Sequence, residues 1–120
     1  MLYHGSNNSA LSIDDIAVIR NGTKQGKKGR TYGGFYCADN AAHAIQYANM
    51  SGNTPAVFNV MLCDNIKTFH KSGDVTRLSA EYIDSLLNQG YQMVIGKDLF
   101  GRNEYVIIDK TAIKALNNFM

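Results

Sequence analysis

The chain has 120 residues, a length that suits one domain with a single hydrophobic core over residues 1–120. Hydrophobic residues make up 45% and charged residues 18% of it, which excludes a disordered chain. The net charge of +2 is too small to indicate nucleic-acid binding by itself. No apolar run approaches the roughly 20 residues that cross a membrane. No signal peptide is visible, so we expect a cytoplasmic protein or one delivered to a target cell without such a signal.

The first half of the chain is predicted to contain two short strands, two helices and a loop. Residues 1–4 form an apolar strand that runs into a turn at His-Gly-Ser-Asn-Asn. Residues 12–20 place apolar side chains at helical spacing behind a capping serine. Residues 21–34 contain five glycines and no hydrophobic period, which is typical of a loop. A short strand at 35–37 then precedes a helix over 40–49 that begins at an Asp-Asn pair.

The second half is dominated by strands. An apolar, β-branched run predicts a buried strand over 56–63, with residues 65–69 as its continuation after a bend. Ser79 is the predicted cap of a helix that ends before Gly90. Three further strands are predicted at 91–95, 104–109 and 112–116, with a short helix as the alternative for the last. Because strands do not alternate regularly with helices, we expect an α+β domain with a mixed or antiparallel sheet.

The two cysteines, Cys37 and Cys63, lie in apolar runs and form no CxxC pair. We therefore expect reduced, buried thiols, which favours a reducing compartment. Neither the cysteines nor the three histidines show the spacing of metal ligands, so we expect no metal.

Two features of the sequence are candidates for binding a flat ligand. His4 is followed by a glycine at a predicted strand end, which would leave the ring and the backbone accessible; an ordinary turn is the plain alternative. Tyr36 lies at a strand end and Tyr47 on the helix that follows. Two facing rings would form a slot for a flat, cationic ring. On the residues alone, packing of both rings in the core is the more common outcome.

Charged residues supply two more candidates. Glu104 stands at the start of an apolar strand, where a carboxylate can stabilise a developing cation; a solvated glutamate at a sheet edge is the alternative. The loop at residues 20–34 holds three lysines and two arginines, which suits phosphate groups. It matches no known phosphate-binding motif, so a solvated loop is an equal alternative.

Taken in order, three blocks of the sequence resemble one family. They are Leu-Tyr-His-Gly-Ser at 2–6, Gly-Gly-Phe-Tyr-Cys-Ala-Asp with its helix at 33–48, and Arg-Asn-Glu-Tyr-Val-Ile-Ile-Asp at 102–109. They resemble the ADP-ribosyltransferases of the His-Tyr-Glu class, which includes the poly(ADP-ribose) polymerase catalytic domains and diphtheria toxin. The resemblance implies a compact ADP-ribosyltransferase fold, with a split mixed or antiparallel β-sheet core, a few short helices and a cleft for NAD.

The resemblance also implies roles for residues of the first two blocks. His4 would bond a ribose hydroxyl of NAD, and Gly5 would pair its backbone N–H and C=O with the nicotinamide carboxamide. Ser6 would lie beside the bound NAD. The basic loop matches the family's segment that covers NAD, and Arg30 is the residue we expect at the pyrophosphate. An acidic acceptor, nucleic acid included, is the alternative partner of that loop.

The centre of the chemistry follows from the same resemblance. Tyr36 and Tyr47 would sandwich the nicotinamide ring. Glu104 would bind the 2′-hydroxyl of the nicotinamide ribose and stabilise the oxocarbenium-like transition state as nicotinamide leaves. The predicted catalytic residues are thus Glu104, His4 and Tyr36.

Some departures from the family narrow the expected activity. Ala44 stands where the polymerases commonly carry a serine that bonds the carboxamide. The chain lacks the long insertion that helps a polymerase hold its acceptor, so we expect transfer of single ADP-ribose units. Arginine-specific relatives carry Glu or Gln two residues before the catalytic glutamate, where this chain has Arg102, so an arginine acceptor is not expected.

The sequence therefore predicts a monomeric mono-ADP-ribosyltransferase with NAD as co-substrate and an unidentified protein or nucleic acid as acceptor. Compact bacterial and phage relatives often act as toxins or effectors, and NAD hydrolysis would be a side reaction of the same site. The alternatives are a catalytically silent module that binds NAD or ADP-ribose, and a small nucleic-acid-binding domain that uses the basic loop.

Overall fold

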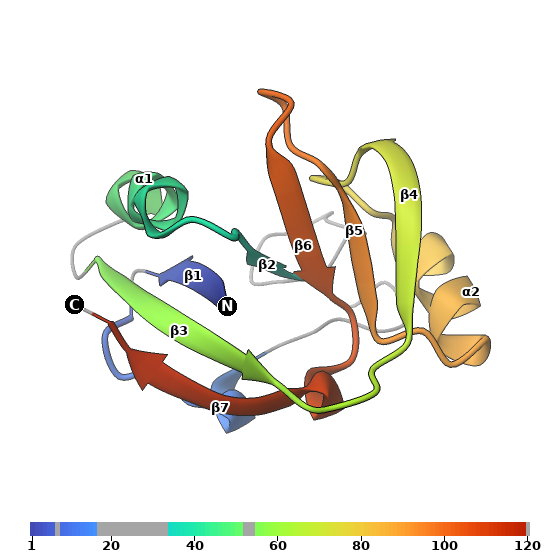
Figure 1. Cartoon of the computed structure of the whole chain (residues 1–120), viewed down its shortest axis with the longest axis horizontal. Coiled ribbons are helices and arrows are strands. Elements are labelled where there is room, and N and C mark those ends of the chain that lie inside the picture. The colour runs from blue at the N-terminus through green and yellow to red at the C-terminus, as the bar shows by residue number, and fades with distance from the viewer. Residues whose placement is uncertain (7, 17–33, 52–54, 120) are drawn as a thin grey trace.

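The computed structural model describes residues 1–6, 8–16, 34–51 and 55–119 (Figure 1). In chain order its elements are β1 (Leu2–Ser6), η1 (Ile13–Asp15), β2 (Phe35–Cys37), α1 (Ala41–Ser51), β3 (Ala56–Leu62), β4 (Thr68–Asp74), α2 (Ala80–Asn88), β5 (Met93–Lys97), β6 (Asn103–Ile107), η2 (Lys110–Ala112) and β7 (Ile113–Asn118). Here α marks α-helices and η marks 3-10 helices.

The described strands form two sheets. One has three antiparallel strands in the order β1-β3-β7, and the other has four strands in the order β2-β6-β5-β4. Within the second sheet β2, β6 and β5 are antiparallel, whereas β4 and β5 are parallel and are joined through α2. Figure 1 shows the two sheets side by side, with α1 and α2 at opposite sides of the molecule. The expected α+β class with mixed and antiparallel sheets is confirmed.

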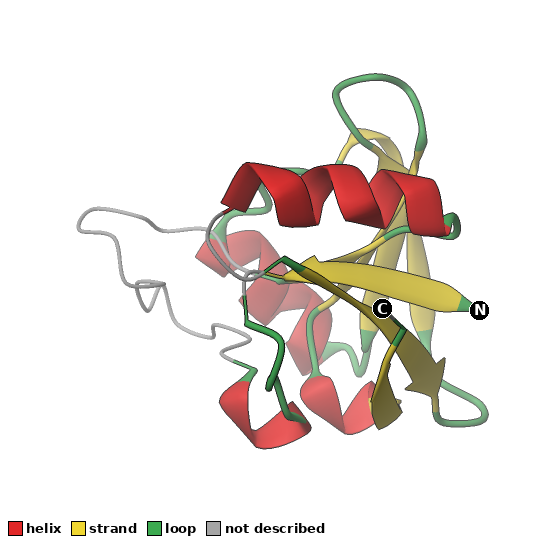
Figure 2. Ribbon diagram, turned by 90° about the vertical axis from the view of Figure 1, so that its left-hand side faces the viewer, coloured by secondary structure: helices red, strands yellow, loops and turns green. Residues whose placement is uncertain are grey.

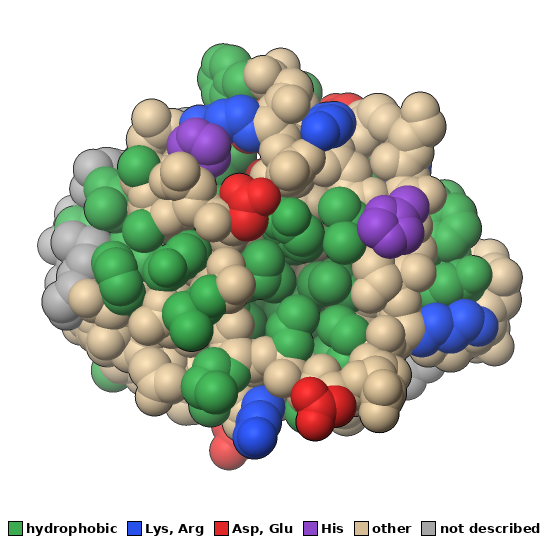
Figure 3. Space-filling model, in the orientation of Figure 1, with side chains coloured by type: hydrophobic (Ala, Val, Ile, Leu, Met, Phe, Trp, Pro, Cys, Tyr) green, Lys and Arg blue, Asp and Glu red, His purple; other side chains and the backbone are tan. Residues whose placement is uncertain are grey.

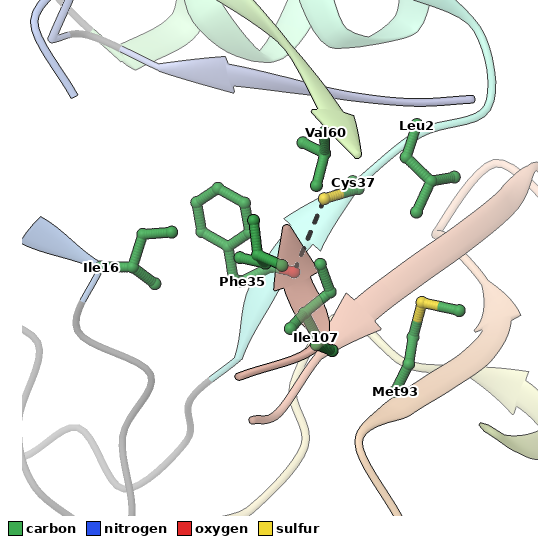
Figure 4. Close-up of a cluster of buried hydrophobic side chains, with 9 residues drawn as sticks. Leu2, Ile16, Phe35, Cys37, Val60, Met93 and Ile107 are labelled. Carbon is green, nitrogen blue, oxygen red and sulfur yellow. Dashed lines mark hydrogen bonds between the residues drawn. The ribbon is translucent and has the colours of Figure 1, made fainter. Parts of the chain in front are cut away.

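The largest hydrophobic cluster joins the two sheets. Leu2 and Val60 come from the three-stranded sheet, and Phe35, Met93 and Ile107 come from the four-stranded sheet. Figure 4 shows these side chains, with those of Cys37 and Ile16, gathered between the strands. Because alternate residues of a strand point to opposite faces, the other faces of both sheets remain to be covered by helices.

The two α-helices cover those outer faces. Ala44 and Ala48 of α1 pack with Val57 behind the three-stranded sheet, where Figure 2 shows the helix running alongside β1. On the four-stranded sheet, Ile83 and Leu86 of α2 pack in a second cluster with residues of β5 and β6. Burial of these apolar side chains is the main force that docks each helix on its sheet.

Several expected boundaries are confirmed. The Oγ atom of Ser79 accepts the backbone N–H of Tyr82 at 3.1 Å and so caps α2. Gly90 follows the helix with φ +86°, a conformation that favours glycine. Asn40 caps α1, because its Oδ1 atom accepts the N–H of Ala42 at 2.8 Å. The C-terminal segment forms the last strand, β7, as expected.

The structure corrects three other expectations. The described part of the helix predicted at 12–20 is only the 3-10 helix η1, and residues 17–20 lie outside the described residues. Residues 65–69 do not continue β3, because the chain turns at Asn65, whose φ is 59°, and β4 then joins the other sheet. His4 lies inside a strand rather than at its end, because β1 pairs with β3 as far as Ser6.

Both cysteines are free thiols, but only Cys37 is buried as expected. Cys63 is half-buried, because it follows the end of β3, and its Sγ atom lies 3.5 Å from the carbonyl oxygen of Thr111. In the described parts of the chain, no helix has the length and apolar character needed to span a membrane.

Candidate functional site

The register of the four-stranded sheet brings Tyr36 and Glu104 to the same face. Tyr36 on β2 is directly opposite Val106 on β6, so their side chains share a face. Glu104 lies two residues before Val106, and residues two apart on a strand point the same way. Tyr36 and Glu104 are therefore diagonal neighbours, a relationship that separates side chains by roughly 7–8 Å at their bases. The strand pairing unites two expected site residues from distant blocks.

Tyr47 reaches the same place from helix α1. Its hydroxyl oxygen lies 3.4 Å from Oε2 of Glu104 and 3.2 Å from Oδ2 of Asp98. A tyrosine hydroxyl carries one hydrogen, so it donates to one carboxylate at a time. Docking of α1 on β1 thus completes a cluster of one tyrosine and two acidic residues.

Asp98 begins the loop between β5 and β6 and organises it. Its Oδ1 atom accepts the backbone N–H groups of Phe100 at 2.8 Å and of Arg102 at 2.9 Å. Its Oδ2 atom accepts Nε of Arg102 at 2.7 Å in an ion pair. Gly101, with φ +79°, closes the turn. This hairpin fixes the residues that immediately precede Glu104.

Arg102 ties the hairpin loop to helix α1. Its guanidinium donates to Oε1 of Gln46 at 2.8 Å. The same group lies 5.9 Å from the centre of the Tyr47 ring and 5.1 Å from that of Phe100. A guanidinium near aromatic rings is attracted to their π-systems. Arg102 therefore helps to hold Tyr47 in its position.

Glu104 is a perturbed carboxyl group. It is 2% exposed, so the interpretation as a solvated glutamate at a sheet edge is wrong. Burial and the neighbouring charge of Asp98 raise the pKa of Glu104 to about 7, against the partial opposition of Tyr47 and Arg102. Glu104 thus exchanges its proton near neutral pH, and above that range it is a buried carboxylate that can stabilise a cation.

The two neighbours of Glu104 keep opposite protonation states. Burial, followed by the charges of Glu104 and Asp98, raises the pKa of Tyr47 to about 12, so the phenol remains protonated. Burial disfavours the Asp98 carboxylate, but the N–H donors and the guanidinium of Arg102 outweigh it and hold its pKa below the ordinary value. Near neutral pH, Asp98 is therefore charged and Tyr47 is a hydrogen-bond donor.

His4 is held in the space between the two sheets. Its ring stacks on Phe35 with 3.8 Å between centroids and 21° between planes. Its Nδ1 atom is 2.5 Å from the carbonyl oxygen of Tyr36, and since a carbonyl only accepts, Nδ1 carries the hydrogen. Burial lowers the pKa of His4 to about 4 despite this bond. The ring is therefore neutral near neutral pH, and the lone pair of Nε2 can accept a hydrogen bond from a hydroxyl group.

Gly5 is required by the contact with helix α1. A Cβ atom at this position would lie 2.0 Å from the carbonyl oxygen of Ala44 and 2.8 Å from the backbone nitrogen of Ala48. The backbone N–H and C=O of Tyr3 form hydrogen bonds with the backbone of Ala38. Ala38 lies along the edge of β1 that faces away from β3. Since backbone groups repeat every two residues along an antiparallel strand, those of Gly5 point to that same outer edge.

The remaining expected site residues are Ser6, Tyr36 and Arg30. Ser6 is buried at the end of β1, and its Oγ accepts the N–H of Asn8 at 3.0 Å. Tyr36 packs against the cluster beneath α2 and donates its hydroxyl to the carbonyl of Thr76 at 3.0 Å. The sandwich of a nicotinamide ring between Tyr36 on β2 and Tyr47 on α1 stays a prediction. Arg30 lies outside the described residues.

A separate cavity of about 460 Å³ is lined by residues of β1, β3, β5 and β6. Its walls are mainly apolar, and Asp39 and Tyr105 contribute the polar groups, with the Tyr105 hydroxyl donating to Oδ2 of Asp39 at 3.1 Å. Figure 3 shows the broad hydrophobic area on the face drawn in Figure 1. None of the expected site residues lines this cavity. Within the described ranges, no three His, Cys, Asp or Glu residues are grouped as metal ligands.

Sequence reasoning missed Asp98. In the sequence Lys-Asp-Leu-Phe-Gly-Arg, an aspartate three residues before a glycine is typical of a turn residue, and this is part of its role. The available signal was the hairpin spacing, since a loop that closes between β5 and β6 brings its first residue next to Glu104. That signal requires the pairing of the two strands, which the sequence left open.

The comparisons with known proteins assign no family to the chain. No protein-family model matches the chain, and no curated protein matches it.

Proposed function

We propose that the protein is a mono-ADP-ribosyltransferase that cleaves the bond between nicotinamide and ribose in NAD. The observation that carries the proposal is the meeting of Tyr47 and Glu104, two residues that the resemblance assigns to one site. The buried position of Glu104 supports it, because a carboxylate in a low-dielectric environment stabilises a nearby cation more strongly than one in water.

Several other residues of the chain fit NAD as a co-substrate. Nδ1 of the neutral His4 ring donates its hydrogen to the carbonyl oxygen of Tyr36, so Nε2 is the acceptor for a ribose hydroxyl. The backbone N–H and C=O of Gly5 point to an outer strand edge, where they suit the two hydrogen-bonding groups of a carboxamide. The Tyr47 ring supplies an aromatic surface for the flat nicotinamide ring. Ala44 has no side-chain hydroxyl, so it cannot make the carboxamide contact of the serine that the polymerases carry at this position.

In the proposed reaction, the bond between C1′ of the ribose and the nicotinamide nitrogen breaks, and the electron pair leaves with nicotinamide. The ionised Glu104 accepts the 2′-hydroxyl hydrogen bond and stabilises the positive charge on the sugar. A nucleophilic oxygen or nitrogen of the acceptor then forms a new bond to C1′ and releases its proton to solvent or to a base. The acceptor is a protein or a nucleic acid, with water as the acceptor in the side reaction, and a toxin or effector role is consistent with this chemistry.

The test is release of nicotinamide from NAD by the wild type and by Glu104→Gln, with and without cell lysate. The assay is run above the pKa of Glu104, which is about 7, so that the carboxylate predominates. Glu81→Gln is the matched control, because Glu81 is an exposed residue in the first turn of α2. Release by the wild type and by Glu81→Gln, with none by Glu104→Gln, is the expected result.

Two other results would change the conclusion. Binding of NAD by calorimetry without any release would indicate the silent binding module. If the wild type neither binds NAD nor releases nicotinamide, the proposal is overturned. The basic loop would then direct the search toward nucleic acid.

A further inference from the structure

Asp98 has no assigned part in the reaction proposed above, yet it is the most heavily bonded carboxylate of the site. Its side chain is 2% exposed. Two backbone N–H groups, the guanidinium of Arg102 and the hydroxyl of Tyr47 all lie within hydrogen-bonding distance of its oxygens. The backbone bonds explain the turn, but the contact with Tyr47 is an additional one that reaches a different element of the fold.

The shared hydroxyl of Tyr47 couples the two acidic residues. It has one hydrogen and lies 3.2 Å from Asp98 and 3.4 Å from Glu104. When Glu104 is protonated, it can donate to Tyr47 while Tyr47 donates to Asp98. When Glu104 is ionised, both carboxylates compete for the single hydrogen of Tyr47. The ionisation of Glu104 and the bonding of Asp98 are therefore linked through one atom.

We propose that Asp98, held by Arg102, is a positioning residue that acts on Glu104 through the hydroxyl of Tyr47. The inference rests on the function proposed above. Asp98 fixes the Tyr47 ring next to the reacting carboxylate, and its charge raises the pH at which Glu104 ionises, in addition to the effect of burial. Arg102 keeps Asp98 in place and limits the effect of its charge.

The groups that face Glu104 give each variant an expected sign. The charge of Asp98 disfavours ionisation of Glu104, whereas Arg102 and the hydrogen bond from Tyr47 favour it. Cys37, on the neighbouring strand β2, is a neutral thiol because burial raises its pKa well above the ordinary value. Gly96, opposite Glu104 on β5, contributes no side chain.

The direct test follows the side-chain carboxyl of Glu104 by carbon NMR during a pH titration. The chain contains only two glutamates, and Glu81 is exposed, so the spectrum carries its own reference. Asp98→Asn should lower the pKa of Glu104, whereas Tyr47→Phe and Arg102→Gln should raise it. Asn retains the side-chain oxygen that accepts the two loop N–H groups, so the hairpin should remain folded.

A matched control separates this effect from a general change in charge. Asp64 is exposed in the turn after β3, and Asp64→Asn should leave the Glu104 titration unchanged. Thermal unfolding of each variant checks that the fold is retained, and Arg102→Gln tests the same linkage if Asp98→Asn does not fold.

The second readout is the pH profile of nicotinamide release. Asp98→Asn should shift the acidic limb of kcat/KM to lower pH and reduce kcat by about tenfold or more, because Tyr47 and Glu104 lose part of their fixed geometry. Asp64→Asn should keep the wild-type profile. A structural defect alone would lower activity without moving the acidic limb.

The two proposals fail in different ways. If the wild type releases no nicotinamide but Asp98→Asn shifts the Glu104 titration, the transferase function fails and the action of Asp98 on Glu104 stands. If the wild type is active and Asp98→Asn leaves both the titration and the acidic limb unchanged, the inference about Asp98 is overturned and the function stands.

Discussion

The hydroxyl oxygen of Tyr47 lies 3.4 Å from Oε2 of Glu104, although 57 positions separate the two residues in the chain. Tyr47 is held on helix α1, which packs against β1 through Gly5. Glu104 is held on β6, at the base of the hairpin that Asp98 organises. The candidate site therefore depends on the position of the three-stranded sheet relative to the four-stranded sheet.

Replacing Glu104 should make the protein more stable above neutral pH. The pKa of Glu104 in the folded chain is about 7, above its ordinary 4.5, so the folded state binds more protons than the unfolded state between these values. Stability therefore falls as the pH rises through this window. At pH 8, Glu104→Gln should gain on the order of 2–3 kcal/mol in the free energy of unfolding, measured with urea.

The same comparison at pH 4 is the control, because the carboxyl is then protonated in both states and the gain should nearly vanish. Glu81→Gln, on the exposed face of α2, should change stability little at either pH. An equal stability of the wild type and Glu104→Gln at pH 8 would contradict the burial of an ionised group at this site.

His4 should give stability the opposite pH dependence. Its pKa in the folded chain is about 4, below the ordinary 6.5, so the unfolded state binds more protons between these values. The contribution of His4 is present above about pH 6.5 and is lost as the pH falls toward 4. In the Glu104→Gln background, which removes the opposing slope, stability should rise with pH across this window.

His4→Gln, in that same background, should flatten the rise while keeping a side-chain donor for the carbonyl of Tyr36. His43→Gln, on helix α1, is the matched histidine control. Urea unfolding at four or five pH values measures both slopes, and an unchanged slope in His4→Gln would disprove the assignment to His4.

Gly5→Ala should destabilise the fold and disturb the site. Its Cβ atom would lie 2.0 Å from the carbonyl oxygen of Ala44, so helix α1 must move away from β1. This overpacking against the backbone should lower the free energy of unfolding by about 2–3 kcal/mol. The displacement also moves Tyr47, so nicotinamide release should fall even at temperatures where the variant is folded.

Gly73→Ala provides the comparison for backbone strain alone. Gly73 has φ +84° and open space around the position of a Cβ atom. We therefore expect Gly73→Ala to lower the free energy of unfolding by about 1 kcal/mol and to leave the activity unchanged. Equal effects of the two substitutions on thermal stability and on activity would refute the steric account of Gly5.

Tyr36→Phe should separate the structural role of Tyr36 from its proposed role in binding. The substitution removes the bond to the carbonyl of Thr76, which should cost about 1 kcal/mol of stability. The ring remains, so the KM for NAD should change little. Tyr36→Leu removes the aromatic ring, and a KM that stays at the wild-type value in this variant would exclude the ring from the NAD site.

The local elements were largely predictable from the sequence. The serine cap and the glycine stop of α2 satisfy backbone groups within a few residues, so their signal is local. The resemblance of the three blocks predicted that Tyr47 and Glu104 belong to one NAD site; the two side chains lie 3.4 Å apart, and the NAD site stays a prediction. Of the helix predicted at 12–20, the described residues form only the 3-10 helix η1. The continuation of β3 was wrong, because the turn at Asn65 sends the chain to the other sheet.

Only the tertiary structure decided what surrounds Glu104. The sequence placed a carboxylate at a strand start, where exposure is common, but the packing of α1 and the hairpin buried it. It also brought Asp98 to the Tyr47 hydroxyl, and burial together with the charge of Asp98 raises the pKa of Glu104 against the opposing effect of Arg102. Burial and charge proximity are properties of neighbours in space, and the chain reveals them only after distant strands have paired.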